Sequence, residues 1–304
     1  MTDTVFEWTA EGRRLTIRDL VSQADFRETE DLQREAWGFS DLDIVPGAQM
    51  IAAKWAGGAA LGAFDGDRMI GFVYGFPAME GGHLSMHSHM LAVRKDSRRL
   101  KAGIKLKLAQ RERALAAGIK EISWTFDPFR SLNASLNFGR LGVISNRYLV
   151  DFYGEETSSP LHRGIGTDRL WVRWLIDSAR VKTRLMEIEA GAGPSQSSLT
   201  EIKLSPELAT ELSGEDRPAL LVGSGAKWKR TNDIDEALKS PETLIQIPLD
   251  IEHLKNKNIN QASYWRECAQ GWFIGAFAAG LTAVDFIRVN SDSAPAGLYR
   301  LTRT

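Results

Sequence analysis

The residues best suited to chemistry gather in one stretch, HLSMHSHMLAVRKDSRRLKAGIKLKLAQRERALAAG, which spans residues 83–118. Its first part alternates apolar residues as a β-strand does, and its last part has helical spacing. Between the two stands a short turn that contains Arg98, Arg99 and Lys101. The first N–H groups of a helix are unpaired and lie at the positive end of its dipole, so cationic side chains beside them predict an anion site. The competing interpretation is a solvated basic helix start.

Three of the five histidines, His83, His87 and His89, lie at alternate positions of the strand and are expected to share one of its faces. An imidazole titrates near neutral pH, so this group is a candidate general base. Two alternatives remain open. One is a partly buried polar strand face, and the other is a metal site, for which no clear carboxylate partner is evident.

The neighbouring elements predict an α/β fold. Asp65-Gly66-Asp67-Arg68 joins two apolar runs and is typical of a hairpin turn. Periodicity predicts strands over 14–20, 59–64, 69–76, 83–93, 121–126, 143–153 and 169–176, and helices over 24–37, 48–55, 97–117 and 131–141. A hairpin run followed by alternating strands and helices predicts a mixed sheet with helices on both faces.

A shift in composition predicts the domain division. GAGPSQSS, residues 191–198, is rich in small and polar residues and is typical of a linker. We therefore expect one domain over residues 1–190 and a smaller C-terminal α+β domain over 191–304. In the second domain the pattern predicts strands over 219–222, 244–247, 281–289 and 297–302 and a helix over 261–279.

Composition limits the classes of partner. The net charge is −1 at 43% hydrophobic content, so nothing global favours nucleic acid or an acidic membrane, and any anion site must be local. Cys268 is the only cysteine, which excludes an internal disulfide and fits a reducing compartment. The first residues lack the pattern of a secretory signal, and no window is apolar enough to span a membrane. These observations lead us to expect a cytoplasmic protein.

The central stretch resembles the signature of the GNAT family of N-acetyltransferases. In that family a strand that ends in Leu-x-Val precedes an (Arg/Gln)-x-x-Gly-x-(Gly/Ala) loop, which opens a helix. Here Leu91-Ala92-Val93 precedes Arg98-Arg99-Leu100-Lys101-Ala102-Gly103. The flanking elements agree over about residues 14–176, with Asn133-Ala134 on the next helix and Leu141-Gly142 at its end.

The resemblance implies a GNAT-like central mixed sheet and acetyl-CoA, or another acyl-CoA, as co-substrate. Loop N–H groups would hold the pyrophosphate, and the strands on either side of the helix would admit pantetheine. The resemblance assigns this site to Leu91, Val93, Arg98, Arg99, Lys101, Ala102, Gly103, Ile104 and Asn133. An amine would attack the thioester directly, with N–H groups near Leu91 and Val93 stabilising the oxyanion.

Two residues depart from the family pattern. Lys101 occupies the position of the first glycine, and its side chain could hinder close approach of the backbone to phosphate. Phe138 stands where many members have a tyrosine that protonates the departing thiolate. Phenylalanine cannot donate a proton, so Asn137, Tyr148 or Tyr153, or water, would have to do so. Loss of this acid need not abolish turnover.

The candidate catalytic residues are therefore His87 and His89 as bases, Tyr148 as an acid and Asp127 at the acceptor side. Asp127 precedes Pro128, so a turn-forming role is the simplest one, and binding of a cationic acceptor is the alternative. The leading hypothesis is an acyl-CoA-dependent N-acyltransferase that acts on a small-molecule or peptide amine. The alternatives are a non-catalytic acyl-CoA-binding protein and an interaction protein whose C-terminal domain forms a homodimer contact or an acceptor lid.

Overall fold

The computed structural model of this chain describes residues 4–154, 165–191, 202, 204–212, 217–225, 227–231, 233–289 and 296–303. Two compact units are present. Of the described residues, 4–124 and 175–177 form the N-terminal unit, and 125–154, 165–174 and those from 178 to 303 form the C-terminal unit. The predicted linker, residues 191–198, lies outside the described residues except for Gly191. The division into domains over 1–190 and 191–304 stays a prediction.

The N-terminal unit is built on a six-stranded sheet in the order β1-β2-β3-β4-β5-β6. Neighbours are antiparallel, apart from β5 and β6, which are parallel. The elements are β1 (Thr4–Ala10), β2 (Arg13–Asp19), α1 (Gln23–Trp37), α2 (Gly47–Trp55), β3 (Ala59–Asp65), β4 (Arg68–Glu80), β5 (His83–Val93), the 3₁₀ helix η1 (Lys95–Leu100), α3 (Ala102–Ala116) and β6 (Glu121–Phe126), whose last two residues belong to the other unit.

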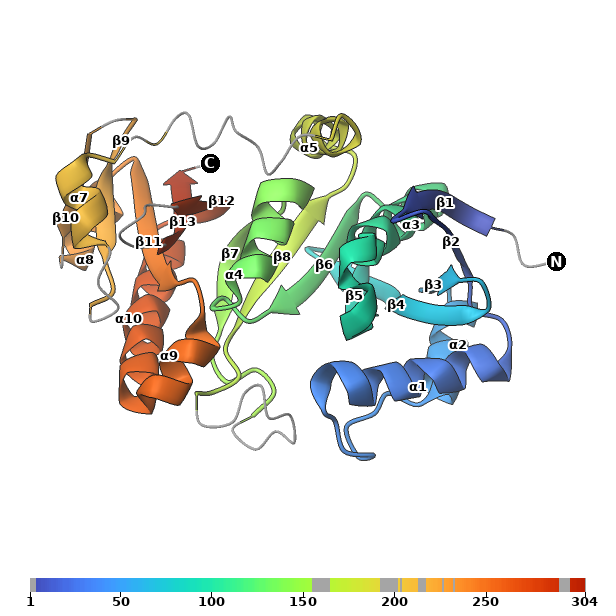
Figure 1. The fold of residues 1–304 in the computed structure, drawn as a ribbon. Helices are drawn as coiled ribbons and strands as arrows, with labels where there is room; N and C mark the ends of the chain where they lie inside the picture. Colours follow the sequence, from blue (N-terminus) through green and yellow to red (C-terminus); the bar gives the residue numbers. More distant parts are fainter. Residues whose placement is uncertain are drawn as a thin grey trace. The chain divides into compact units, whose positions relative to one another are not determined.

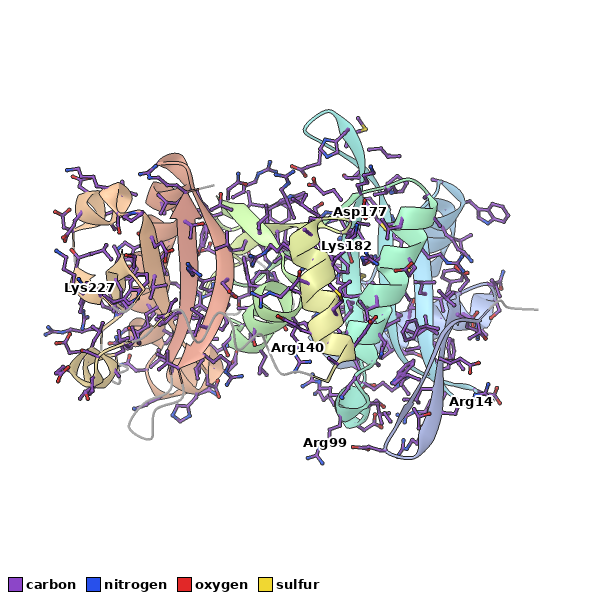
Figure 2. The ribbon with its side chains drawn as sticks, turned by 90° about the horizontal axis from the view of Figure 1, so that it is seen from above. Arg14, Arg99, Arg140, Asp177, Lys182 and Lys227 are labelled. Atoms are coloured by element: carbon purple, nitrogen blue, oxygen red, sulfur yellow. The ribbon has the colours of Figure 1, made fainter. Side chains whose placement is uncertain are left out.

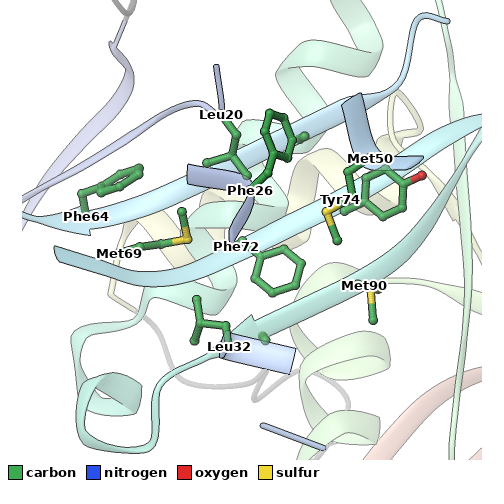
Figure 3. Close-up of a cluster of buried hydrophobic side chains, with 11 residues drawn as sticks. Leu20, Phe26, Leu32, Met50, Phe64, Met69, Phe72, Tyr74 and Met90 are labelled. Carbon is green, nitrogen blue, oxygen red and sulfur yellow. The ribbon is translucent and has the colours of Figure 1, made fainter. Parts of the chain in front are cut away.

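Helices cover both faces of this sheet, as the sequence predicted (Figure 1). On one face, Phe26 and Leu32 of α1 and Met50 of α2 pack against Phe72 and Tyr74 of β4 (Figure 3). On the other face, α3 packs against apolar side chains of β2, β3 and β4. Burial of these apolar surfaces is the main stabilising contribution to the unit.

In the C-terminal unit the strands follow the order β8-β7-β12-β13-β11-β9-β10, with antiparallel neighbours throughout. Its long helix α10 packs on β7, β11 and β12. The elements are α4 (Ser131–Ala134), the π-helix η2 (Ser135–Leu141), β7 (Ile144–Leu149), β8 (Arg169–Leu175), α5 (Ala179–Glu189), α7 (Pro206–Glu211), β9 (Leu220–Ser224), β10 (Lys227–Thr231), α8 (Ile234–Lys239), β11 (Glu242–Pro248), α9 (Ile251–Lys257), α10 (Ile259–Ala278), β12 (Leu281–Val289) and β13 (Ala296–Arg303).

The mixed α/β fold predicted from the sequence is confirmed, and two predicted helices differ in detail. The helix expected over 97–117 is interrupted, because Lys101 adopts a left-handed conformation between η1 and α3. The helix expected over 131–141 widens into a π-helix after Ala134. None of the helices in the described parts of the chain combines the length and the hydropathy needed to cross a membrane.

Asp25 fixes the start of α1. Ser22 and Asp25 form a capping box, and both Asp25 oxygens also accept hydrogen bonds from Arg18 at 2.9 Å. The carboxyl group is 7% exposed, and although burial opposes ionisation, the bonds from Arg18 and from the N–H groups of Val21 and Ser22 lower its pKa. The Asp25 carboxylate therefore links β2 to the start of α1 through hydrogen bonds.

We predict that Asp25→Ala lowers the free energy of unfolding by about 2–3 kcal/mol, because it removes the cap and leaves Arg18 without its partner. Since the folded pKa is lowered, the wild-type advantage is present above about pH 4 and is lost as pH falls below it. Urea unfolding at several pH values measures both effects. Asp31→Ala, which removes an exposed ion pair with Arg34, is the control and should cost under about 0.5 kcal/mol. Equal losses for the two variants would contradict this account.

Candidate functional site

The parallel pairing of β5 with β6 is short. It joins Met86 to Ile122 and His87 to Ser123, whereas β5 continues to Val93. The last residues of β5 therefore pair with β4 on one side and have no registered β6 partner on the other. Backbone N–H and C=O groups need partners, so this edge of β5 can accept an extended ligand.

A β-bulge lies just beyond this pairing. Gly75 of β4 faces Ser88 and Tyr74 faces Met90, so His89 is the extra residue in β5. A side chain at Gly75 would clash, because its Cβ would stand 2.8 Å from the carbonyl oxygen of His87. Bulges bend a strand and re-aim its side chains, and they are frequent beside active sites.

The turn after β5 contains a left-handed residue immediately before α3. Lys101 has φ 61° and ψ 18°, and it is the N-cap residue of α3. No side chain caps this helix, and its first turn has no acidic residue. The N–H groups that begin α3 are thus available to an anion. A left-handed lysine is strained by about 1 kcal/mol, so this backbone conformation is costly.

The cationic side chains of the turn differ in their ion pairing from other arginines near the surface. Arg68 and Arg94 are held by carboxylates at 2.7 Å and 2.6 Å. Arg98, Arg99 and Lys101 are exposed and form no ion pair with any described residue. Figure 2 shows that the side chain of Arg99 projects away from the body of the N-terminal unit. These side chains can turn toward a bound phosphate without breaking an existing ion pair.

The structure brings His87 and His89 together, with ring centroids 6.1 Å apart beside the ring of Phe76. Burial lowers the pKa of His87 to about 4, with smaller contributions from His89 and Lys107. His89 lies exposed at the bulge, but desolvation by the surrounding rings lowers its pKa too. Both rings are therefore neutral at pH 7, as a proton acceptor must be.

His83 takes no part in this pair. Its Nε2 lies 3.3 Å from Glu121 Oε2 at the start of β6. His87 Nδ1 lies 3.2 Å from Ser123 Oγ. Among the residues that the structure describes, no group of three or more His, Cys, Asp or Glu side chains is placed to bind a metal ion.

Lys107 is a candidate site residue that was not predicted from the sequence. It extends from α3 and is 5% exposed, with Nζ 2.7 Å from Ser88 Oγ and 3.7 Å from the centre of the Trp124 ring. Burial lowers its pKa to about 7. The spacing in the sequence could have indicated its burial. Lys107 lies three residues after Ile104 and three before Gln110, on the side of the helix that packs on the sheet.

Asp127 and Tyr148 belong to the C-terminal unit. Asp127 is 4% exposed and accepts hydrogen bonds from Arg266 at 2.8 Å and 2.9 Å and from the N–H of Phe129 at 3.0 Å. The Tyr148 hydroxyl donates a hydrogen bond to Asp168 at 2.7 Å, and burial, followed by the Asp168 charge, raises the pKa of Tyr148. Asp127 thus has the turn-forming contact predicted as its simplest role. The catalytic roles of both residues stay predictions.

Phe138 and Asn133 also lie in the C-terminal unit. Phe138 is fully buried on η2, with its ring 5.6 Å from that of Tyr299. It fills a core position and offers no proton donor. Asn133 is exposed on α4, and its assignment to CoA binding stays a prediction.

Comparison with known proteins found no matching family model and no matching curated protein. Solved acetyltransferase structures do match. The ribosomal-protein-S18-alanine N-acetyltransferase from Escherichia coli is 13% identical, with 54% of this chain and 96% of that chain covered at a TM-score of 0.43. A putative GNAT-family acetyltransferase from Desulfovibrio desulfuricans is 16% identical, with 53% and 99% covered at 0.43. A GNAT-family acetyltransferase from Elizabethkingia anophelis with acetyl-CoA bound is 16% identical, with 53% and 97% covered at 0.42.

We predict that Lys101→Gly stabilises the protein by about 0.5–1 kcal/mol, because glycine adopts positive φ without strain. Chemical denaturation measures the change. Lys95→Gly in η1 is the matched control, since Lys95 is not among the residues with positive φ, and it should lose stability. A loss of stability in Lys101→Gly equal to that of the control would contradict a strained turn.

A second prediction concerns the cost of burying Lys107. Its folded pKa of about 7 lies below the unfolded value, so the unfolded chain binds more protons between about pH 7 and pH 10. Wild-type stability should therefore rise across this range relative to Lys107→Met, by up to about 1.4 kcal/mol per pH unit. At pH 6, Lys107→Met should be the more stable protein. Parallel stability curves for the two proteins would show that Lys107 is not buried as described.

Proposed function

We propose that this protein binds acyl-CoA across the turn of residues 94–104 and transfers the acyl group to an amine. The observation that carries the proposal is the left-handed Lys101 at the uncapped start of α3. A left-handed backbone is one that glycine adopts readily, and Lys101 has it at the position where the motif has glycine. Arg98 and Arg99, which are exposed beside it, supply positive charge for the pyrophosphate.

The incomplete pairing of β5 supports a position for the rest of the ligand. Pantetheine carries amide groups, which can hydrogen-bond to an unpaired strand edge as a peptide does. Such a ligand would extend along β5 from the turn toward the bulge at His89. The thioester would then lie near the point where the pairing with β6 ends.

The acceptor in this proposal is the neutral amine of a small molecule or a peptide. The neutral rings of His87 and His89 lie together beside Phe76 and can take up the proton that the amine loses. Backbone N–H groups of β5 near Leu91 are the candidates that stabilise the oxyanion.

We predict that Arg98→Glu weakens acetyl-CoA binding about tenfold or more, because it reverses a charge beside the phosphates. Isothermal titration calorimetry on the folded variant measures the affinity. Arg14→Glu is the matched control, a charge reversal at an exposed arginine of β2. It should bind acetyl-CoA within about twofold of the wild type. Equal affinities for all three proteins would place the ligand elsewhere.

A second candidate function is non-catalytic binding of acyl-CoA. The specific observation in its favour is that Phe138 is locked in the core and that the hydroxyl of Tyr148 is engaged by Asp168. Release of free CoA thiol from acetyl-CoA across a panel of amines and peptides separates the two functions. Binding without thiol release for every acceptor would favour the non-catalytic protein, and amine-dependent release would establish the transferase.

A further inference from the structure

Lys107 occupies the point where β5 and β6 cease to pair. The last registered pair is His87 with Ser123. The next residue of β5 is Ser88, whose Oγ lies 2.7 Å from Lys107 Nζ. The next residue of β6 is Trp124, whose ring centre lies 3.7 Å from the same nitrogen. The ammonium group thus spans the two strands at the end of their ladder.

Among the described residues, no carboxylate forms an ion pair with this ammonium group. Its remaining contact is Gln110 Oε1 at 3.4 Å, so its partners are a hydroxyl, an amide and an aromatic face. The described carboxylates that form ion pairs form them with cations other than Lys107. A buried charge without a counter-ion is costly, and residues that keep such a cost are frequent in functional sites.

We propose that Lys107 is the cation that stabilises the sulfur of CoA as it leaves the thioester and then protonates it. This inference rests on the proposed function, which brings the thioester to the end of the β5–β6 pairing. A thiolate there would be the counter-ion that Lys107 lacks. Lys107 would also be the proton donor that the buried Phe138 cannot be.

The step balances within these groups. The acceptor nitrogen forms a bond to the acyl carbon, the carbon–sulfur bond breaks, and sulfur keeps the bonding pair beside the Lys107 ammonium. Lys107 gives one proton to sulfur, CoA leaves as the thiol, and the neutral amine takes a proton from solvent. The proton from the acceptor nitrogen goes to one neutral imidazole, that of His87 or that of His89, or to water.

Burial and a bound thiolate would act on the pKa of Lys107 in opposite directions. Its facing groups are Ser88 of β5, Gln110 of α3 and Trp124 of β6, and His87 is the titratable group coupled to it. Without a ligand, burial favours the neutral amine. A thiolate at this point would favour the ammonium, so that lysine and thiol titrate as a coupled pair.

The ultraviolet absorbance of the thiolate in the complex with CoA tests the proposal and needs no acceptor. Calorimetry first establishes CoA binding. The absorbance spectrum of the complex with desulfo-CoA is then subtracted from that of the CoA complex, which removes the absorbance of the tyrosines and of Cys268. At pH 7.5 we expect about tenfold more thiolate in the wild-type complex than in the Lys107→Met complex. Lys107→Gln, which keeps a hydrogen-bond donor without the charge, should behave like Lys107→Met and serves if the first variant does not fold.

Lys120→Met, at an exposed position beyond the far end of α3, is the control and should match the wild type. Equal thiolate in the wild-type and Lys107 variant complexes would overturn the role of Lys107 and leave the proposed function intact. A wild-type protein that does not bind CoA would overturn both. A purely structural role for Lys107 would change the unfolding temperature without changing the amount of thiolate.

Discussion

The short parallel pairing of β5 with β6 is the constraint on which the chemistry of the N-terminal unit depends. Only Met86 and His87 of β5 are registered with β6, while the antiparallel pairing with β4 extends along the whole strand. One edge of β5 is thereby held rigidly by the sheet while part of the other edge stays open. A binding site gains precision from such a rigid support, because ligand groups meet backbone groups that are already fixed.

Several costly local features collect around this open edge. Lys101 has a left-handed backbone, Lys107 is buried with no counter-ion among the described residues, and His89 is an extra residue in its strand. Each departs from what would best stabilise a sheet packed against a helix. Natural proteins concentrate such departures at functional sites, so their proximity supports this region as the site. The three histidines do not form one cluster, because His87 and His89 are paired and His83 is separate from them. This separation argues against a metal site built from all three.

The sequence was sufficient for features that depend on local chemistry. Asp65-Gly66 marked the hairpin between β3 and β4, and alternation marked β5. The sequence was insufficient for features that depend on contacts between residues far apart in the chain. The ion pair between Asp127 and Arg266 joins residues 139 positions apart. The bulge at His89 depends on the register with β4, and burial of Lys107 depends on how α3 is rotated against the sheet.

Hydrogen exchange of individual backbone amides with and without acetyl-CoA tests the central claim most directly. The account predicts slower exchange on binding at the N–H groups of Lys101–Ile104 and along the open edge of β5 up to Val93, with little change in the C-terminal sheet. Those amides either begin α3 or lack a registered β6 partner, so a ligand held by them must protect them. Protection confined to other segments, or no protection at saturating acetyl-CoA, would contradict the account.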